Sequence, residues 1–489
     1  MKVFSFLFFI AFFTTTLSIE AQNWTLTKES KITEKGVKDI IPQVFAIYDM
    51  DDQEMKSLLW SAPKEENVDV RQSNVIINIG LPNRNTEPFR VVRYQMMEPE
   101  LSSKYDEIRT FYGISSIDAY KSVRIDYTIH GFRAVISSPE GKIFIDHYQR
   151  NDKNTRVVYH KKDYKKAPSW GCNVTSSHDD NNRSELISGS RIGDCQLRSY
   201  RLAQATTGEY SQFHGGTQTS VMSAVVTAIN RINEVYEAEV AVRLILVANT
   251  DQIFYYTAAT DPYTNNNGGT MLGENQTTCD NVIGNANYDI GHVFSTGGGG
   301  VAYLQSVCNN SIKAGGVTGS GSPVGDPFTI DYVAHEMGHQ FGGNHTQFNS
   351  CNRSNNSAME PGSASTIMGY AGICSPNVQS NSDAYFHGRS LQEMKTFLLN
   401  GGGNCDQIVS SFSNSTPSVT AQTNYTIPRS TPFALTLAAT DPNNDPMTLM
   451  LSLPLKQCHQ PLRILQALYS EALILVLARL DTFQISPQY

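Results

Sequence analysis

Residues 335–345 of this 489-residue chain read HEMGHQFGGNH, a stretch of the form H-E-x-x-H-x-x-G-x-x-H. Residues four apart on an α-helix lie one above the other, so His335 and His339 can present their imidazoles to one metal ion. Glu336 points in a different direction and is predicted to act as a base rather than a ligand. Gly342 can take the positive φ that ends a helix, which lets His345 reach the same ion as a third ligand.

This set of ligands predicts a catalytic zinc site. Three neutral imidazoles leave the charge of Zn²⁺ undiminished, and the fourth tetrahedral position stays open for water. Zinc lowers the pKa of a bound water to about 7, and Glu336 is predicted to take its proton and return it to the departing amine of a peptide bond. The sequence therefore predicts a zinc-dependent endopeptidase that uses one Zn²⁺.

The residues before the motif favour the helix that this geometry needs. Asp326 and Pro327 have the order of an N-cap and a first-turn residue. Apolar side chains then recur at helical spacing, at Ile330, Ala334, Met337 and Phe341. We expect this stripe to face the core.

A methionine follows the motif, in the stretch TIMGY at residues 366–370. The motif and this methionine resemble the metzincin clan of zinc endopeptidases. The surrounding sequence, over roughly residues 190–405, resembles secreted reprolysin-like (adamalysin-like) members in LRSYRL (197–202), TTGEY (206–210), GGVAYL (299–304) and STIMGYAGIC (365–374). Animal adamalysins usually place Asp directly after the third His, whereas this chain has Thr346, which makes pappalysin-like peptidases a neighbouring alternative.

The resemblance implies an α+β fold for the catalytic domain, with a mixed twisted sheet and an active-site helix. It implies that Met368 forms an apolar floor beneath the imidazoles without binding the metal. Tyr370 is either an additional, displaceable zinc ligand or oxyanion donor, or a packed aromatic. Residues 299–307 are either an edge strand that binds an extended protein or peptide substrate, or a plain loop.

The N-terminus has the layout of a secretory signal peptide, predicted for residues 1–21. Lys2 precedes an apolar run over residues 3–13, and small and polar residues lead to a cleavage site after Ala21. The run is shorter than the roughly 20 residues that cross a bilayer, and no other segment is long enough, so we expect a secreted protein without a membrane span.

Residues 22–190 are predicted to be a propeptide that keeps the enzyme latent as a zymogen. They are too many for a linker, and their alternating stretches at 75–79, 124–129 and 142–145 predict strands of an α+β or mainly β fold. Residues 99–108 are predicted to be a short helix. Acidic and basic residues balance up to residue 190, so the formal net charge of −8 falls on the remainder. This acidity argues against a nucleic-acid partner.

Cysteine spacing suggests bridges and a second regulatory feature. Six of the eight cysteines fall inside the predicted catalytic domain, residues 191–409, which leaves room for three disulfides: Cys195, Cys279, Cys308, Cys351, Cys374 and Cys405. Cys172 lies upstream and has two open interpretations. In the first, Cys172 binds the zinc as a thiolate in the precursor and so acts as a cysteine switch. In the second, it pairs with Cys195 in an ordinary disulfide. Cleavage near Arg183 or Arg191 would remove Cys172, whereas cleavage at Lys161–Lys162 or Lys165–Lys166 would retain it.

The last 80 residues differ in composition from the rest. A capping box at Ser390–Glu393 predicts a final catalytic helix through Leu399, and residues 410–489 are predicted to be a linker and a partial immunoglobulin- or cadherin-like β module. The turn at residues 441–446 carries two Asp that suggest Ca²⁺, although a plain β-turn is commoner. After Leu453 the strand pattern stops, which suggests a truncated or frame-shifted tail, with a terminal amphipathic helix as the alternative.

Two other functions compete with the peptidase. One is a catalytically inactive adhesion or binding protein on a metzincin scaffold, with the β module carrying the function, and the other is a non-peptidase zinc hydrolase. Glu336 favours an enzyme over the binding protein, because binding alone has no use for the base.

Overall fold

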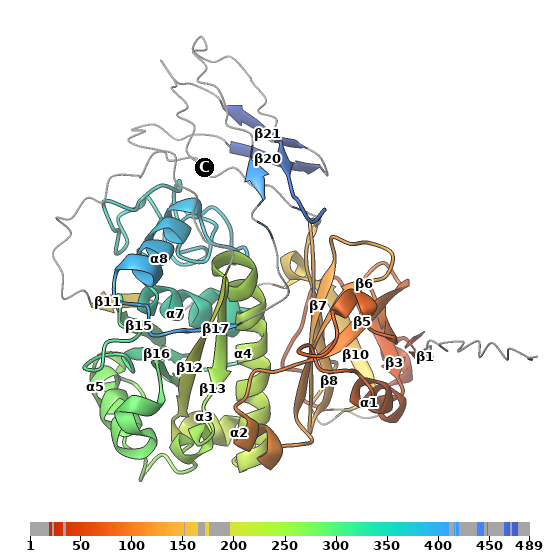
Figure 1. Cartoon of the computed structure of the whole chain (residues 1–489), viewed down its shortest axis with the longest axis horizontal. Coiled ribbons are helices and arrows are strands. Elements are labelled where there is room, and N and C mark those ends of the chain that lie inside the picture. The colour runs from red at the N-terminus through yellow and green to blue at the C-terminus, as the bar shows by residue number, and fades with distance from the viewer. Residues whose placement is uncertain are drawn as a thin grey trace, which may run out of the picture.

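The computed structural model describes residues 19–21, 24–32, 36–150, 152–164, 172–175, 196–409, 415, 417–419, 438–444, 447, 464–469 and 472–477 (Figure 1). Most of the predicted signal peptide, the candidate cleavage positions at Arg183 and Arg191, Cys195, Cys458 and much of the predicted C-terminal β module lie outside these residues.

The predicted propeptide region, with β1 from the end of the predicted signal peptide, forms a ten-stranded sheet in the order β1-β4-β5-β6-β7-β8-β9-β10-β3-β2. Every neighbouring pair is antiparallel except β1 with β4. Its strands are β1 (Ile19–Ala21), β2 (Trp24–Leu26), β3 (Ala46–Met50), β4 (Val75–Gly80), β5 (Thr86–Tyr94), β6 (Arg109–Ser115), β7 (Ser122–Thr128), β8 (Gly131–Ser138), β9 (Gly141–His147) and β10 (Thr155–His160). The three predicted strands are thus confirmed, as β4, β7 and β9.

Short helices accompany this sheet: α1 (Asp52–Trp60), α2 (Pro99–Lys104) and the 3-10 helices η1 (Glu29–Lys31), η2 (Val70–Gln72) and η3 (Lys161–Asp163). Helix α2 begins at Pro99 as predicted but ends at Lys104, before the predicted end at residue 108. Tyr105, its C-cap, leaves the helical region with φ −121° and ψ 56°. The region is therefore mainly β, as expected.

The second sheet has seven strands in the order β11-β15-β16-β14-β12-β13, with β17 paired to β12. They are β11 (Cys172–Thr175), β12 (Leu197–Thr206), β13 (Val242–Leu246), β14 (Ile290–Ser295), β15 (Gly299–Tyr303), β16 (Gly316–Gly319) and β17 (Gln407–Val409). Parallel pairs dominate, whereas β15 runs antiparallel to β16 and β17 antiparallel to β12. This mixed sheet confirms the predicted α+β class.

Helices surround the second sheet. They are α3 (Gly208–Phe213), α4 (Gln218–Val240), α5 (Gly268–Cys279), α6 (Gly325–Phe328), α7 (His335–Gln340) and α8 (Gly388–Asn400), with 3-10 helices η4 (Thr250–Ile253) and η6 (Asn285–Asn287) and π-helical turns η5 (Asp280–Gly284) and η7 (Thr329–Ala334). The capping-box prediction for α8 is wrong. The helix begins two residues earlier, because the His387 side chain accepts the Arg389 N–H and so provides the cap.

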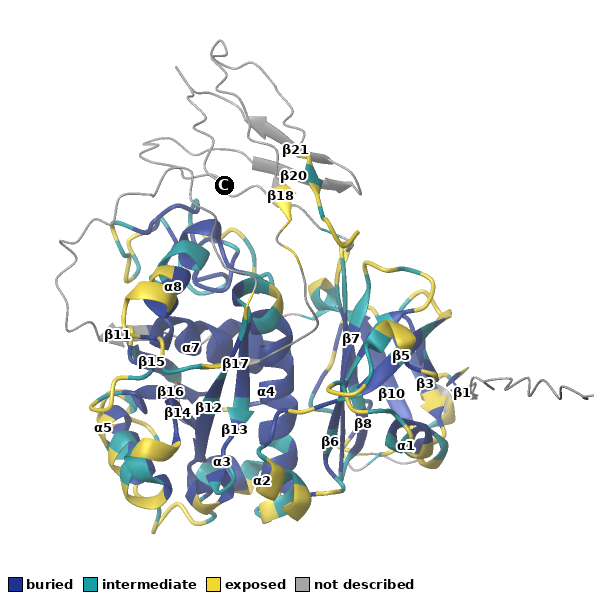
Figure 2. Ribbon diagram, viewed as in Figure 1, coloured by how far each residue is buried: buried dark blue, intermediate teal, exposed yellow. Residues whose placement is uncertain are grey.

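Helix α4 lies between the two sheets, and its central turns are buried (Figures 1 and 2). A capping box starts it, in which the Thr217 side chain accepts the Ser220 N–H. Tyr94 and Ile108 from the first region belong to the same apolar core as Ile229 of α4 and Phe341 after α7. The two regions are therefore packed into one body. None of the described helices is long and apolar enough to cross a membrane.

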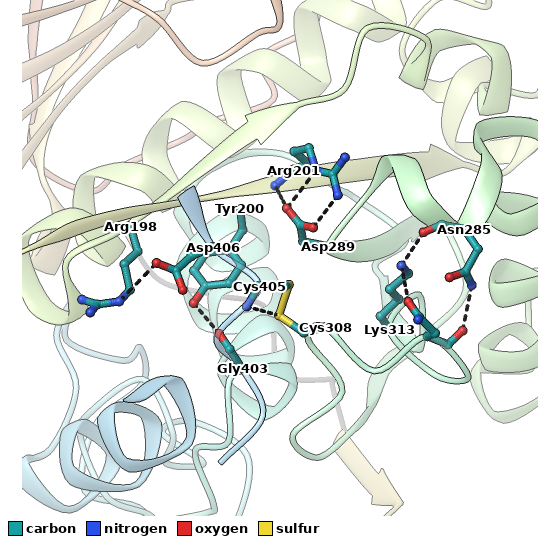
Figure 3. Close-up of a disulfide and its surroundings, with 11 residues drawn as sticks. Arg198, Tyr200, Arg201, Asn285, Asp289, Cys308, Lys313, Gly403, Cys405 and Asp406 are labelled. Atoms are coloured by element: carbon teal, nitrogen blue, oxygen red, sulfur yellow. Dashed lines mark hydrogen bonds and ion pairs between the residues drawn. A yellow bond between two sulfur atoms is a disulfide. The ribbon is translucent and has the colours of Figure 1, made fainter. Parts of the chain in front are cut away.

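Two disulfides form among the described cysteines, Cys308–Cys405 and Cys351–Cys374. The first ties the loop after β15 to the segment entering β17, beside a hydrogen bond from Tyr200 Oη to Gly403 O (Figure 3). The prediction of three bridges is wrong for Cys279, which is a free, buried thiol. Its sulfur lies 3.7 Å from the Asn275 Oδ1 in its own helix.

The described parts of the C-terminal region contain two short antiparallel pairs. Strands β18 (Ser418–Val419) and β19 (Ala439–Thr440) form one, and β20 (Ile464–Tyr469) and β21 (Ala472–Leu477) form the other. The second pair contradicts both the loss of strands after Leu453 and the terminal-helix alternative. Two largely apolar six-residue runs, the first interrupted by Gln466, are separated by two polar residues, a pattern that suits a hairpin. At the predicted turn, Asp441 accepts the Asn443 N–H, as a plain turn requires.

Candidate metal centre

The histidine motif lies on a continuous helical segment formed by α6, η7 and α7. His335 and His339 lie on α7, and Gly342 ends the helix with φ 99°, as its sequence position predicts. The prediction that Asp326 caps this segment is wrong. Its N-cap is Val324, and the Asp326 carboxylate lies 2.8 Å from Lys161 Nζ, a contact to the first region.

Each of the three imidazoles is oriented by a backbone carbonyl. His335 Nδ1 lies 2.6 Å from Ile367 O, His339 Nδ1 2.7 Å from Gly343 O, and His345 Nδ1 2.8 Å from Asn352 O. A carbonyl oxygen can only accept a hydrogen bond, so each Nδ1 carries the proton and donates it. Each neutral ring therefore presents an unprotonated Nε2.

The three Nε2 atoms converge on one point, with separations of 3.1, 3.1 and 3.2 Å. None of these contacts is a hydrogen bond, because all three atoms are acceptors. Zn–N bonds of about 2.0–2.1 Å in a tetrahedron would place such nitrogens roughly 3.3–3.4 Å apart. Burial and the neighbouring rings hold the pKa values of His339 and His345 well below their ordinary range, which keeps the rings neutral. The donor set fits a zinc ion.

Glu336 lies beside this cluster and is completely buried. Neither of its carboxylate oxygens has a hydrogen-bond partner among the described residues. Burial raises the pKa of Glu336 to about 8, an effect that the neighbouring Cys172 thiol partly offsets. A buried carboxyl without a partner is costly for a fold, and such groups are characteristic of sites that act on a ligand or substrate.

Cys172 joins the three histidines as a fourth ligand candidate. One ligand atom from each of the four residues lies within 4.8 Å of the others, and Cys172 Sγ lies 3.7 Å from His339 Nε2. Cys172 is a free, buried thiol rather than half of a bridge to Cys195. Cys172 belongs to the predicted propeptide, so the structure brings a thiol from that region beside the three imidazoles.

The family follows from a comparison of the sequence with known protein families. Residues 197–396 match the family described as Metallo-peptidase family M12B Reprolysin-like. This part of the chain is a reprolysin-like metzincin domain. Among solved structures, metalloproteinase-II from Bacteroides fragilis is 12% identical in sequence, with a TM-score of 0.38, over 69% of this chain and 96% of that chain. No curated protein matches the chain.

Two further residues of the metzincin domain, Met368 and Tyr370, pack against the histidine motif. Met368 is fully buried and packs against the active-site helix, since a Cβ added to Gly338 would lie 2.5 Å from the Met368 sulfur. The Tyr370 ring packs edge-on to the His345 ring, with centroids 4.7 Å apart. The Tyr370 hydroxyl donates to Cys172 O at 2.8 Å, so its partner here is the propeptide backbone.

Strand β15 covers the first half of the expected edge strand at residues 299–307. It pairs with β16 on one side and, in parallel, with β11 on the other, where Cys172 is opposite Gly300. Strand β11, from the predicted propeptide, therefore occupies the edge that one of the two interpretations of residues 299–307 assigned to substrate. Gly300 also lies against Glu336, because a Cβ at Gly300 would overlap the Glu336 carboxylate.

Sequence reasoning missed the roles of Asn352 and Gly300. Asn352 Nδ2 donates to both Cys172 O and Tyr370 Oη at 3.1 Å, while its own carbonyl orients His345. No local pattern marks these residues, because each acts on parts of the chain distant in sequence.

Three histidines outside the motif, His214, His292 and His387, have separate roles. His292 is buried between Gln340 Oε1 and Thr318 Oγ1, each 2.9 Å away, and His387 caps α8. His214 follows α3 and faces the first region. Among the described residues, only Cys172 and the three motif histidines form a group suited to a metal.

Proposed function

We propose that this chain is a secreted zinc-dependent endopeptidase that is made as a zymogen. The observation that carries the proposal is the meeting of three unprotonated Nε2 atoms beside the unpartnered carboxylate of Glu336. Three lone pairs so close together repel one another unless a cation lies between them. His335, His339 and His345 would hold that ion.

A bound zinc ion supplies Lewis acidity, which polarises the scissile carbonyl and makes water a usable nucleophile at neutral pH. Glu336 takes a proton from that water on its carboxylate and passes it to the nitrogen of the leaving amine. Its burial excludes competing solvent and strengthens its electrostatic interactions with the reacting atoms. Tyr370 is placed to donate to the oxyanion once its hydroxyl leaves Cys172 O.

Strand β15 supports protein or peptide substrates. Its outer edge is already matched to an extended chain, since β11 pairs with it over four residues. An extended substrate that replaces β11 would make the same kind of backbone hydrogen bonds and would pass directly by Glu336. Small esters and amides have no backbone to pair with this edge, which favours a peptidase over another zinc hydrolase.

The contacts of Cys172 support latency. Its sulfur lies at the three imidazoles, its carbonyl accepts from Tyr370 and Asn352, and its strand covers β15. A catalytic zinc site needs an open ligand position, and Cys172 closes it. The N-terminal signal layout and the two disulfides support export to an oxidising compartment.

The catalytic assignment is tested with Glu336→Gln in the activated enzyme. We expect a loss of at least about 10³-fold in kcat/KM on a denatured protein substrate, with zinc content unchanged. Glu239→Gln, a half-buried carboxylate outside the site, is the matched control and should cleave normally. Wild-type rates in Glu336→Gln would refute the mechanism, and zinc-loaded wild type without peptidase activity would favour the adhesion protein.

Latency is tested with Cys172→Ala in the uncleaved chain. We expect the intact precursor to gain peptidase activity, because the fourth ligand position opens to solvent. Cys279→Ala removes the other free, buried thiol and should leave the precursor latent. A Cys172→Ala precursor as inactive as wild type, yet fully active after cleavage, would show that the thiol is not the inhibitory group.

A further inference from the structure

Glu360 lies outside the histidine motif but is bonded to two segments that shape the metal centre. Its side chain is buried, and Oε2 accepts from the hydroxyls of Thr346 at 2.5 Å and Thr366 at 2.6 Å. Oε1 accepts from the backbone N–H groups of Ser365 at 3.1 Å and Thr366 at 3.2 Å, and from the Ser365 hydroxyl at 3.4 Å. One carboxylate thus receives five donors.

Those donors come from the segments that orient two ligands. Thr346 directly follows His345, and Thr366 directly precedes Ile367, whose carbonyl accepts from His335 Nδ1. The backbone strengthens this connection, because Thr346 N donates to Met368 O at 3.1 Å and Thr346 O accepts from Glu360 N at 2.9 Å. A change at Glu360 therefore reaches both imidazoles.

We propose that Glu360 is a positioning residue that holds His335 and His345 in the geometry that retains zinc. The inference rests on the proposed zinc site and names a residue outside the motif that maintains it. Glu360 touches neither the metal position nor the substrate edge, so it acts only through the two segments. Groups that orient metal ligands in this way typically change metal affinity by 10–100-fold when removed.

The test measures zinc release from the purified, zinc-loaded full chain into a chromogenic chelator. Glu360→Gln keeps the size of the side chain but replaces one acceptor oxygen with an NH₂ group that faces other donors. We expect zinc to leave at least about tenfold faster and the visible spectrum of the Co²⁺-substituted protein to change. Zinc release can be measured whether or not the protein cleaves peptides. A wild-type protein that binds zinc but is inactive would therefore refute the proposed function, while the zinc-release comparison would still decide the role of Glu360.

Asp289→Asn is the matched control. Asp289 is buried and accepts three hydrogen bonds from Arg201, at 2.8, 3.1 and 2.8 Å (Figure 3). It does not belong to the group of residues suited to a metal. Asp289→Asn should lower thermal stability while leaving zinc release within about twofold of wild type. Equal zinc release from Glu360→Gln and Asp289→Asn at matched loss of stability would overturn the proposal.

A milder variant covers the case in which Glu360→Gln does not fold. Thr346→Val removes one donor to Glu360 and keeps the shape of the side chain, and we expect zinc release about threefold faster. Thr250→Val, at an equally buried threonine that bonds the Gln204 backbone, is its control. Wild-type zinc release from Thr346→Val would contradict the inference.

Discussion

Gly300 provides the space that the Glu336 carboxylate occupies. A Cβ at Gly300 would overlap Glu336 Oε1, whereas a Cβ at Gly298, two residues earlier, meets nothing within 4 Å. We expect Gly300→Ala to displace the base and to lower kcat/KM by at least about 10²-fold, because general-base efficiency depends on reach. Gly298→Ala is the control and should cleave normally. Measured zinc content should stay at wild-type levels in both, and zinc loss in Gly300→Ala would point to disruption of the ligands instead.

At the scale of single residues, sequence reasoning reached those whose geometry is local. His335, Glu336 and His339 are placed by helical periodicity, and Gly342 and His345 follow from the need to end the helix. Glu360 and Asn352 were missed because their contacts join segments that no local periodicity relates. Cys172 was found only as a leftover cysteine, and its alternative pairing could not be rejected without the structure.

Helices and strands were predicted well where one periodicity dominates and poorly where a tertiary contact decides an end. Strands β4, β7 and β9 follow from alternation alone. The starts of α6 and α8 were misplaced because Asp326 pairs with Lys161 of another region and His387 caps in place of Ser390. At α6 a contact with a distant segment engages Asp326, whereas at α8 a neighbouring residue, His387, provides the cap.

The Cys308–Cys405 bridge fixes strand β17 to the second sheet. It closes 97 residues of chain, and nearby Arg198 and Asp406 form an ion pair at 3.3 Å (Figure 3). Replacing both cysteines with Ser should lower Tm by about 5–15 °C, since bridges of this size contribute about 2–5 kcal/mol. Thermal unfolding followed by circular dichroism measures this. Cys279→Ser is the single-thiol comparison, and an equal Tm for the double variant and wild type would show that the bridge contributes nothing.

On the scale of the whole molecule, α4 holds the predicted propeptide on the metzincin domain through buried polar pairs. Arg231 Nη2 lies 2.5 Å from Asp146, and Thr227 Oγ1 donates to Asp126 at 2.7 Å. Lys142 pairs with Glu234 one turn further along the helix. Removing one partner of such a pair leaves the other charge buried and unpaired, so the two regions are expected to stay associated after the connecting segment is cut.

Three histidines lie at the boundary between the two regions. His130 and His147 from the first sheet, with rings 6.3 Å apart, and His214 from the metzincin domain line a cavity of about 430 Å³. Burial lowers the pKa of His130 to about 4 and that of His214 to about 3, and holds the pKa of His147 well below its ordinary value of 6.5. The cavity also contains charged groups of both signs: Asp39, Arg133, Asp146, Arg150 and Arg231.

The three imidazoles stay neutral in the complex, whereas in the separated parts they take up protons below about pH 6.5. Acidification between about pH 6.5 and about pH 4 should therefore favour separation of the two parts. For a chain cut near Arg183 or Arg191, we expect propeptide affinity to fall at least tenfold between about pH 7 and about pH 5. Size-exclusion chromatography of the cut protein measures this. Replacing His130, His147 and His214 with Asn should flatten the dependence, and an equally steep loss in that variant would assign it to carboxylates instead.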